Sequence, residues 1–203
     1  VKILRPELAR DPQFHQRFRR EAHSAAALNH PNIVAVYDTG EEIVGEGADA
    51  IRVPFIVMEY VDGATLRQLM NSGRRLLPER ALEITAGILA ALDYSHRHGI
   101  VHRDMKPENV MVTGEGSVKI SDFGAALLKK TQAVHTEVMG SPYYMSPEQI
   151  EEKELTHHSD MYSLGVVLYE LLTGAKPFTA PSLPELAQKI LTEAPQPPSA
   201  LRK

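Results

Sequence analysis

The pattern of secondary-structure signals changes near Asp62 and Gly63, and this change constrains the fold more than any other feature of the sequence. Before it, one helical run stands among three apolar strand-like runs: residues 1–4, 14–28, 33–37 and 55–60. After it, helical patterns flank one pair of short strands: residues 65–70, 78–98, 110–112, 118–120, 159–173 and 184–192. The sequence therefore predicts an α+β chain with two lobes, a small antiparallel-sheet lobe with one helix (1–60) and a larger, mainly helical lobe (61–203).

Local signals predict where some of these elements end. The acidic, Gly-rich stretch at residues 41–49 is expected to be a surface loop. Gly99 and Gly174 are expected to end two of the helices. In the helix predicted at 78–98, helical spacing places five residues on one face: Leu82, Thr85, Leu89, Leu92 and His96.

Composition excludes several classes of function. The 22 basic and 26 acidic residues give a net charge of −4, so a general attraction to nucleic acid is not expected. The absence of cysteine excludes disulfides and thiolate metal sites. The longest apolar stretch, residues 164–172, is interrupted by Glu170 and too short to span a bilayer. We therefore expect a soluble, cytoplasmic domain without a membrane segment in this chain.

Both ends of the chain have the character of interior segments. A strand-like run begins at Val1 without a leading polar segment, and a Pro-rich, loop-like stretch at 194–199 precedes the last residues. We expect the fold to be truncated at both ends. A membrane anchor elsewhere in a longer parent protein is left open.

Polar residues gather in three predicted loops: residues 102–109, 122–124 and 140–148. Two of these loops adjoin predicted strands and contain Asp104, Asn109 and Asp122. Carboxylate and amide oxygens suit Mg²⁺, which takes few protein ligands and completes its shell with phosphates and water. The alternative interpretation is that Asp and Asn are here ordinary turn residues.

These loops resemble motifs of the serine/threonine protein kinases, specifically the eukaryotic-like (Hanks-type) kinases of bacteria. The matching segments are HRDMKPEN at 102–109, DFG at 122–124 and SPE at 146–148, in the family's order and spacing. Ser146 stands where the family usually has Ala. The stretch at 17–37 is especially similar to bacterial members, and the resemblance covers essentially the whole chain.

The resemblance implies roles for the loop residues. Asp104 would orient the acceptor hydroxyl and take its proton, and Lys106 would steady the γ-phosphate of ATP. Asn109 and Asp122 would bind Mg²⁺, or Mn²⁺ in its place.

The resemblance also implies an ATP site in the first lobe. Lys2 would hold the α- and β-phosphates, and Glu21 would pair with Lys2; the alternative, that Glu21 belongs to a solvated helix face, is less favoured. Met58 matches the family's gatekeeper position. The adenine-binding hinge matches Glu59, Tyr60 and Val61, and Met111 would lie under the adenine ring.

Two structural features follow from the same resemblance. An apolar column would couple the first helix to the DFG segment, and its members would be Ala25, Val36, His102 and Phe123. Asp160 would anchor the base of this column by bonding to the backbone of the catalytic loop.

Substrate and regulation are implied in the same way. Lys106 followed by Pro107, together with Ser141, matches the pattern of kinases that phosphorylate Ser or Thr in proteins. Arg103 before Asp104 is typical of kinases activated by phosphorylation of the loop at 122–148. Its candidate phosphosites are Thr131 and Thr136, and a homodimer would allow autophosphorylation.

Two alternatives to an active protein kinase stay open. A pseudokinase-type binding module would be indicated by loss of Lys2, Asp104 or Asp122, and none is lost. A small-molecule phosphotransferase could use the same metal-binding residues, but Lys106-Pro107 and the SPE segment favour a peptide substrate. The Gly-rich loop that would cover the ATP phosphates and an Arg partner for Glu148 are not found in the sequence.

Overall fold

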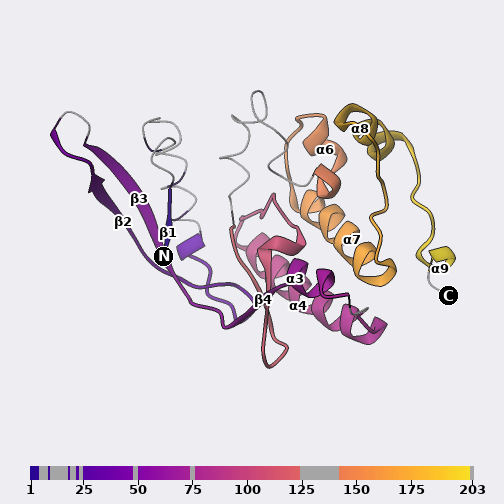
Figure 1. The fold of residues 1–203 in the computed structure, drawn as a ribbon, viewed down its shortest axis with the longest axis horizontal. Coiled ribbons are helices and arrows are strands. Elements are labelled where there is room, and N and C mark those ends of the chain that lie inside the picture. The colour runs from indigo at the N-terminus through magenta and orange to yellow at the C-terminus, as the bar shows by residue number, and fades with distance from the viewer. Residues whose placement is uncertain are drawn as a thin grey trace.

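The structure is a computed structural model that describes residues 1–4, 9, 18, 22, 25–47, 50–73, 76–123 and 142–201. It confirms the α+β class, with an antiparallel sheet from N-terminal segments and helices in most of the remainder (Figure 1). The division into two lobes at residue 60 stays a prediction.

The first sheet has the strand order β1–β3–β2, and all its pairs are antiparallel. Strand β1 spans Lys2–Ile3, β2 spans Val36–Val44 and β3 spans Ile51–Met58. The long β2–β3 hairpin forms one end of the molecule (Figure 1).

The prediction of a loop at residues 41–49 is wrong for residues 41–44, because β2 continues to Val44. Glu41 pairs with Pro54 and Val44 pairs with Ile51, so β3 also begins earlier than expected. Pairing with a neighbouring strand outweighs the weak strand preference of an acidic run, since strand propensity depends strongly on context.

The second sheet has the order β4–β5–β6, with antiparallel pairs throughout. Its strands are β4 (Gly63–Thr65), β5 (Val110–Thr113) and β6 (Val118–Ile120), which confirms the predicted pair of short strands. The run predicted as a strand at 33–37 joins this sheet at its start: Ile33 forms an isolated bridge with Ile120, and the Val34 N–H donates to the Ile120 carbonyl at 2.9 Å.

Four helices agree with the predicted bounds to within two residues: α3 (Leu66–Asn71), α4 (Pro78–Arg97), α7 (His157–Thr173) and α8 (Leu183–Thr192). Shorter helical turns complete the described part: η2 (Pro107–Asn109), η3 (Pro142–Tyr144), α6 (Pro147–Ile150) and α9 (Pro198–Leu201). Gly99 and Gly174 follow α4 and α7 with φ of 72° and 74°, the left-handed conformation that glycine adopts without strain.

The predicted face of α4 is partly wrong. Leu82 and Leu89 are 56% and 38% exposed. The residues that α4 buries are Ala81, Ile84, Thr85, Ile88, Ala91, Leu92 and Ser95. This face contacts β6 and α7, and the spacing taken from Leu82 missed both its small side chains and the two isoleucines, Ile84 and Ile88.

The buried residues form two main clusters. One lies on the first sheet and includes Leu4, Phe18, Ala22, Val53 and Ile56. The larger one fills the helical part, and its members include Leu28, Ile33, Leu66, Ile84, Ile88, Met105, Val110, Ile120 and Val167. Within the part of the chain that the structure describes, no helix has the length and apolar character needed to cross a membrane.

Candidate active site

The loop between α4 and β5 is anchored by one buried carboxylate, that of Asp160 on α7. Its Oδ2 accepts a hydrogen bond from the His102 N–H at 2.8 Å, and its Oδ1 accepts one from the Arg103 N–H at 2.7 Å. The His96 ring also contacts Oδ2, at 2.7 Å. Arg103 has a φ of 69°, which costs about 1–2 kcal/mol for a residue with a side chain. The expected contact between Asp160 and the loop backbone is confirmed.

Asp104, Lys106 and Asn109 contact one another in this loop. The Asn109 Nδ2 donates to the Asp104 carbonyl at 2.7 Å and to Asp104 Oδ2 at 3.0 Å. Lys106 Nζ lies 3.0 Å from the same Oδ2. Two contacts, from Asn109 and Lys106, therefore orient the Asp104 carboxylate, and a third holds the Asp104 carbonyl.

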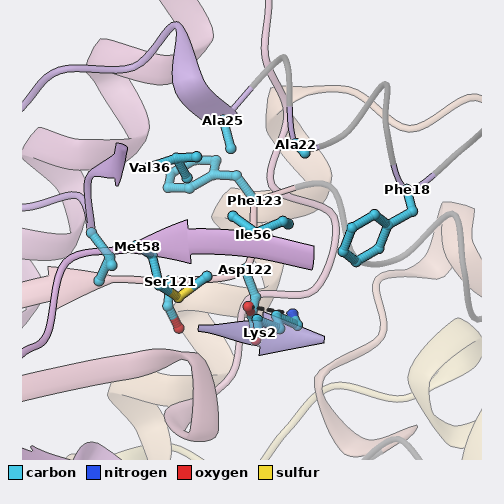
Figure 2. Close-up of a pocket in the computed structure, with 11 residues that line it drawn as sticks. Lys2, Phe18, Ala22, Ala25, Val36, Ile56, Met58, Ser121, Asp122 and Phe123 are labelled. Carbon is cyan, nitrogen blue, oxygen red and sulfur yellow. Dashed lines mark hydrogen bonds and ion pairs between the residues drawn. The ribbon is translucent and has the colours of Figure 1, made fainter. Parts of the chain in front are cut away.

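The residue before Asp122 is hydrogen-bonded to Asn109 of this group. The Asn109 carbonyl accepts hydrogen bonds from the Ser121 N–H at 2.9 Å and from the Ser121 hydroxyl at 3.3 Å. Asp122 follows with a φ of 62°, and its Oδ1 accepts a hydrogen bond from Lys2 Nζ at 2.6 Å (Figure 2). Lys2, on β1, is thus joined to the segment that follows β6.

The Lys2–Asp122 pair lines a pocket (Figure 2). Apart from that pair, its lining is mainly apolar: Phe18, Ala22, Ala25, Val34, Val36, Ile56, Met58, Ser121 and Phe123. The Phe123 ring meets the His102 ring edge-on, with centroids 4.7 Å apart. Three residues of the expected column, Ala25, Val36 and Phe123, line this pocket, and the fourth, His102, contacts Phe123.

The segment predicted as the hinge follows β3 directly. Both carboxylate oxygens of Glu59 lie 2.9 Å from Lys119 Nζ on β6, and Oε2 accepts the Ala35 N–H at 3.2 Å. Burial raises the pKa of Glu59, but the hydrogen bonds and charge of these partners outweigh it and the net pKa is lowered. Tyr60 is exposed, and Met111 on β5 pairs with Lys119 across the second sheet.

Sequence reasoning missed a buried polar network around Arg67 on α3. Its guanidinium donates to Glu108 at 2.9 Å, to Glu170 at 2.9 Å and to the Tyr144 hydroxyl, which itself donates to Glu170. Burial lowers the pKa of Arg67, but the hydrogen bonds of both carboxylates raise it by more. No local pattern signals this network, because its members come from four separate elements.

The segment that matches SPE begins α6. Ser146 and Gln149 cap this helix reciprocally, and Gln149 also reaches the loop at 102–109. Glu148 accepts a hydrogen bond from the Ser159 hydroxyl at 2.6 Å. Burial raises the pKa of Glu148, but this bond and further hydrogen bonds outweigh burial and lower it overall.

Some predicted site residues lie outside the described residues: Glu21, Thr131, Thr136 and Ser141. Their roles stay predictions. Arg103 is described, and its buried Nε has no hydrogen-bond partner among the described residues.

Comparison with known proteins defines the class. Residues 1–199 match the protein kinase domain. Because the match extends over nearly the whole chain, the chain belongs to the protein kinase domain family.

Individual relatives are bacterial serine/threonine kinases. The chain is 56% identical over 203 residues to a probable serine/threonine-protein kinase of Streptomyces coelicolor. It is 50% identical to the serine/threonine-protein kinase PknB of Mycobacterium leprae and 51% identical to PknB of Mycolicibacterium smegmatis. Each match covers 98% of this chain but only 30–32% of the relative, so the chain spans about a third of their length.

The family implies ATP and a divalent metal ion, and the residues present fit both. The Asn109 amide gives its N–H to Asp104, while no described residue donates to its amide oxygen. The backbone bond from Ser121 to the Asn109 carbonyl brings the residue before Asp122 next to Asn109. Among the described residues no group of three or more His, Asp or Glu could bind a metal alone. Two oxygen ligands suit Mg²⁺, which uses phosphates and water for the remainder.

Proposed function

We propose that this chain is the catalytic domain of a serine/threonine protein kinase, which transfers the γ-phosphate of ATP to Ser or Thr hydroxyls of proteins. The observation that carries the proposal is the fixed group of Asp104, Lys106 and Asn109 beside the Lys2–Asp122 pair. Relatives with 50–56% identity that are named serine/threonine-protein kinases support it.

Asp104 is the proposed catalytic base. Its carboxylate would accept a hydrogen bond from the acceptor hydroxyl, orient the oxygen toward the phosphate and take the proton as the bond forms. The bonds from Asn109 and Lys106 hold that carboxylate in one orientation, so little reorganisation is needed when substrate binds. Lys106, already adjacent to Asp104, would balance the negative charge of the γ-phosphate.

Asn109 and Asp122 are the proposed metal ligands. A bound Mg²⁺ or Mn²⁺ would neutralise phosphate charge and favour transfer by electrostatic stabilisation. Lys2, whose ammonium contacts Asp122 in the structure, would hold the α- and β-phosphates. Glu21 is proposed to position Lys2.

The adenine site and the acceptor preference are further parts of the proposal. The hinge set would hold adenine: Met58, Glu59, Tyr60, Val61 and Met111. The bonds of Glu59 to Lys119 and Ala35 support it, because they fix the start of the hinge. The Lys106-Pro107 pattern and Ser141 favour Ser or Thr acceptors.

Regulation would act through the loop at 122–148. A phosphate on Thr136 would pair with Arg103, whose buried Nε has no partner among the described residues, and Thr131 is the second candidate phosphosite. We propose that a homodimer performs this phosphorylation. A cytoplasmic location for this domain, with an anchor elsewhere in the parent protein, belongs to the same proposal.

The test compares Asp104→Asn with the unaltered full-length protein, using labelled ATP, Mg²⁺ and a generic basic protein. Asp93→Asn is the matched control, because Asp93 is exposed on α4 and pairs with Arg97. We expect transfer to Ser or Thr by the unaltered protein and the control, and a loss of about 10²–10⁴-fold in Asp104→Asn. Intact ATP binding without transfer by the unaltered protein would refute the proposal and favour a pseudokinase.

A further inference from the structure

One side chain, that of Gln149 on α6, joins the segment at 142–150 to the catalytic loop. Its Nε2 donates a hydrogen bond to the Arg103 carbonyl at 2.7 Å. Its Oε1 accepts a hydrogen bond from the Ser146 N–H at 2.9 Å. Both polar ends of the amide are therefore engaged, each by a different part of the chain.

The helix cap sets the orientation of this amide. Ser146 is the N-cap residue of α6, and its hydroxyl accepts the Gln149 N–H at 3.4 Å while Gln149 bonds back to the Ser146 N–H. Such a reciprocal cap holds the side chain over the helix start. Because Oε1 faces Ser146, Nε2 is directed toward Arg103.

The Arg103 carbonyl belongs to the peptide unit that leads into Asp104. The N–H of that same unit, on Asp104, donates to His102 Nδ1 at 3.2 Å. A peptide unit is planar and rigid, so a bond at each end fixes its rotation. Asp160 holds the preceding N–H, that of Arg103, whose φ of 69° is strained and needs such support.

We propose that Gln149 is a positioning residue for Asp104: by holding the Arg103 carbonyl it sets the plane of the 103–104 peptide, and with it the direction of the Asp104 side chain. This inference rests on the proposed role of Asp104 as the base. It also means that the end of the 122–148 loop and the base are mechanically joined through Ser146 and Gln149.

The decisive variant is Gln149→Glu in the full-length protein. Glutamate has the same length and keeps an oxygen for the Ser146 N–H, but it has no N–H to donate and its charge repels the Arg103 carbonyl. Gln68→Glu is the matched control, because Gln68 forms the same reciprocal cap with Thr65 and no described bond to the catalytic loop. Gln149→Met, which carries no charge, replaces the first variant if that one does not fold.

Two readouts are measured on each protein: steady-state kinetics and amide hydrogen exchange of residues 102–104. For Gln149→Glu we expect kcat to fall about tenfold while the KM for ATP changes less than about twofold. We also expect faster exchange at residues 102–104. For Gln68→Glu both readouts are expected to match the unaltered protein, with a similar melting temperature in all three.

Unchanged exchange at residues 102–104 in the Gln149 variant would overturn the inference, whatever the kinetics. An equal loss of kcat in the Gln68 control would overturn it too, since capping alone would then explain the effect. If the unaltered protein transfers no phosphate, the proposed function fails, and the exchange readout alone decides whether Gln149 holds the loop.

Discussion

Removing the charge of Arg67 is expected to destabilise the fold strongly. The Arg67 and Glu170 side chains are only 19% and 8% exposed, and Arg67→Met leaves the Glu170 carboxylate and the Tyr144 hydroxyl without their common partner. Breaking a buried ion pair by removing one member costs about 3–5 kcal/mol. The bond to Glu108, which is 41% exposed, adds about 1 kcal/mol at most. A loss near 4 kcal/mol would be a large part of the stability of an ordinary domain.

Urea unfolding measures this loss, with Arg97→Met as the control. Arg97 and its partner Asp93 are 76% and 60% exposed on α4, so that variant should change the unfolding free energy by about 0.5 kcal/mol or less. The double variant Arg67→Met with Glu170→Leu should recover most of the loss, because an apolar pair can replace a buried ion pair. A cost for Arg67→Met no larger than that of the control would refute the reasoning, as would a double variant less stable than both singles.

Three further predictions concern the nucleotide site and its hinge. ATP should raise the melting temperature of the unaltered protein more with Mg²⁺ than with EDTA, and Asp122→Asn should abolish this difference. An equal rise with Mg²⁺ and with EDTA in the unaltered protein would contradict the metal role. Lys119→Met should cost about 1–2 kcal/mol in urea unfolding, because it leaves the Glu59 carboxylate without a charged hydrogen bond, and it should raise the KM for ATP. Because the pKa of Glu59 is lowered, its stabilisation is complete above the ordinary value of 4.5 and is lost as the pH falls through the lower folded value. The stability difference between the unaltered protein and Glu59→Gln should therefore shrink below pH 4.5, and a difference independent of pH would contradict it.

The group proposed to be catalytic could be predicted because its polar residues are close together in sequence. Asp104, Lys106 and Asn109 lie within one loop, and the short β5–β6 pair that follows brings Asp122 back beside Asn109. Polar residues in predicted loops next to predicted strands are enough to identify Asp104, Asn109 and Asp122 as a group, and Lys106 joins it through the family resemblance. The family resemblance then suggested a separate role for each of them.

The extent of β2 and the buried face of α4 could not be predicted, for a different reason. Residues 41–44 are strand because β3 supplies their hydrogen-bond partners, and that partner is specified elsewhere in the chain. Leu82 is exposed because the tertiary contacts of α4 select the side that carries Ala81 and Ser95. In both cases the local pattern was compatible with two structures, and packing chose between them.

The bond of Gln149 to the Arg103 carbonyl could not be predicted, because the helix cap alone is enough to explain a glutamine at this position. Gln68 and Gln149 occupy the same place in two reciprocal helix caps, and each cap alone explains its glutamine. Among the residues that the structure describes, Gln149 alone of the two has a second bond, to a carbonyl 46 residues earlier in the chain. The local sequence is compatible with the same cap at both positions and cannot distinguish them. The shared local structure makes the pair informative, because the cap changes alike in both variants and a difference between them reports the contact of residue 149 with the Arg103 carbonyl.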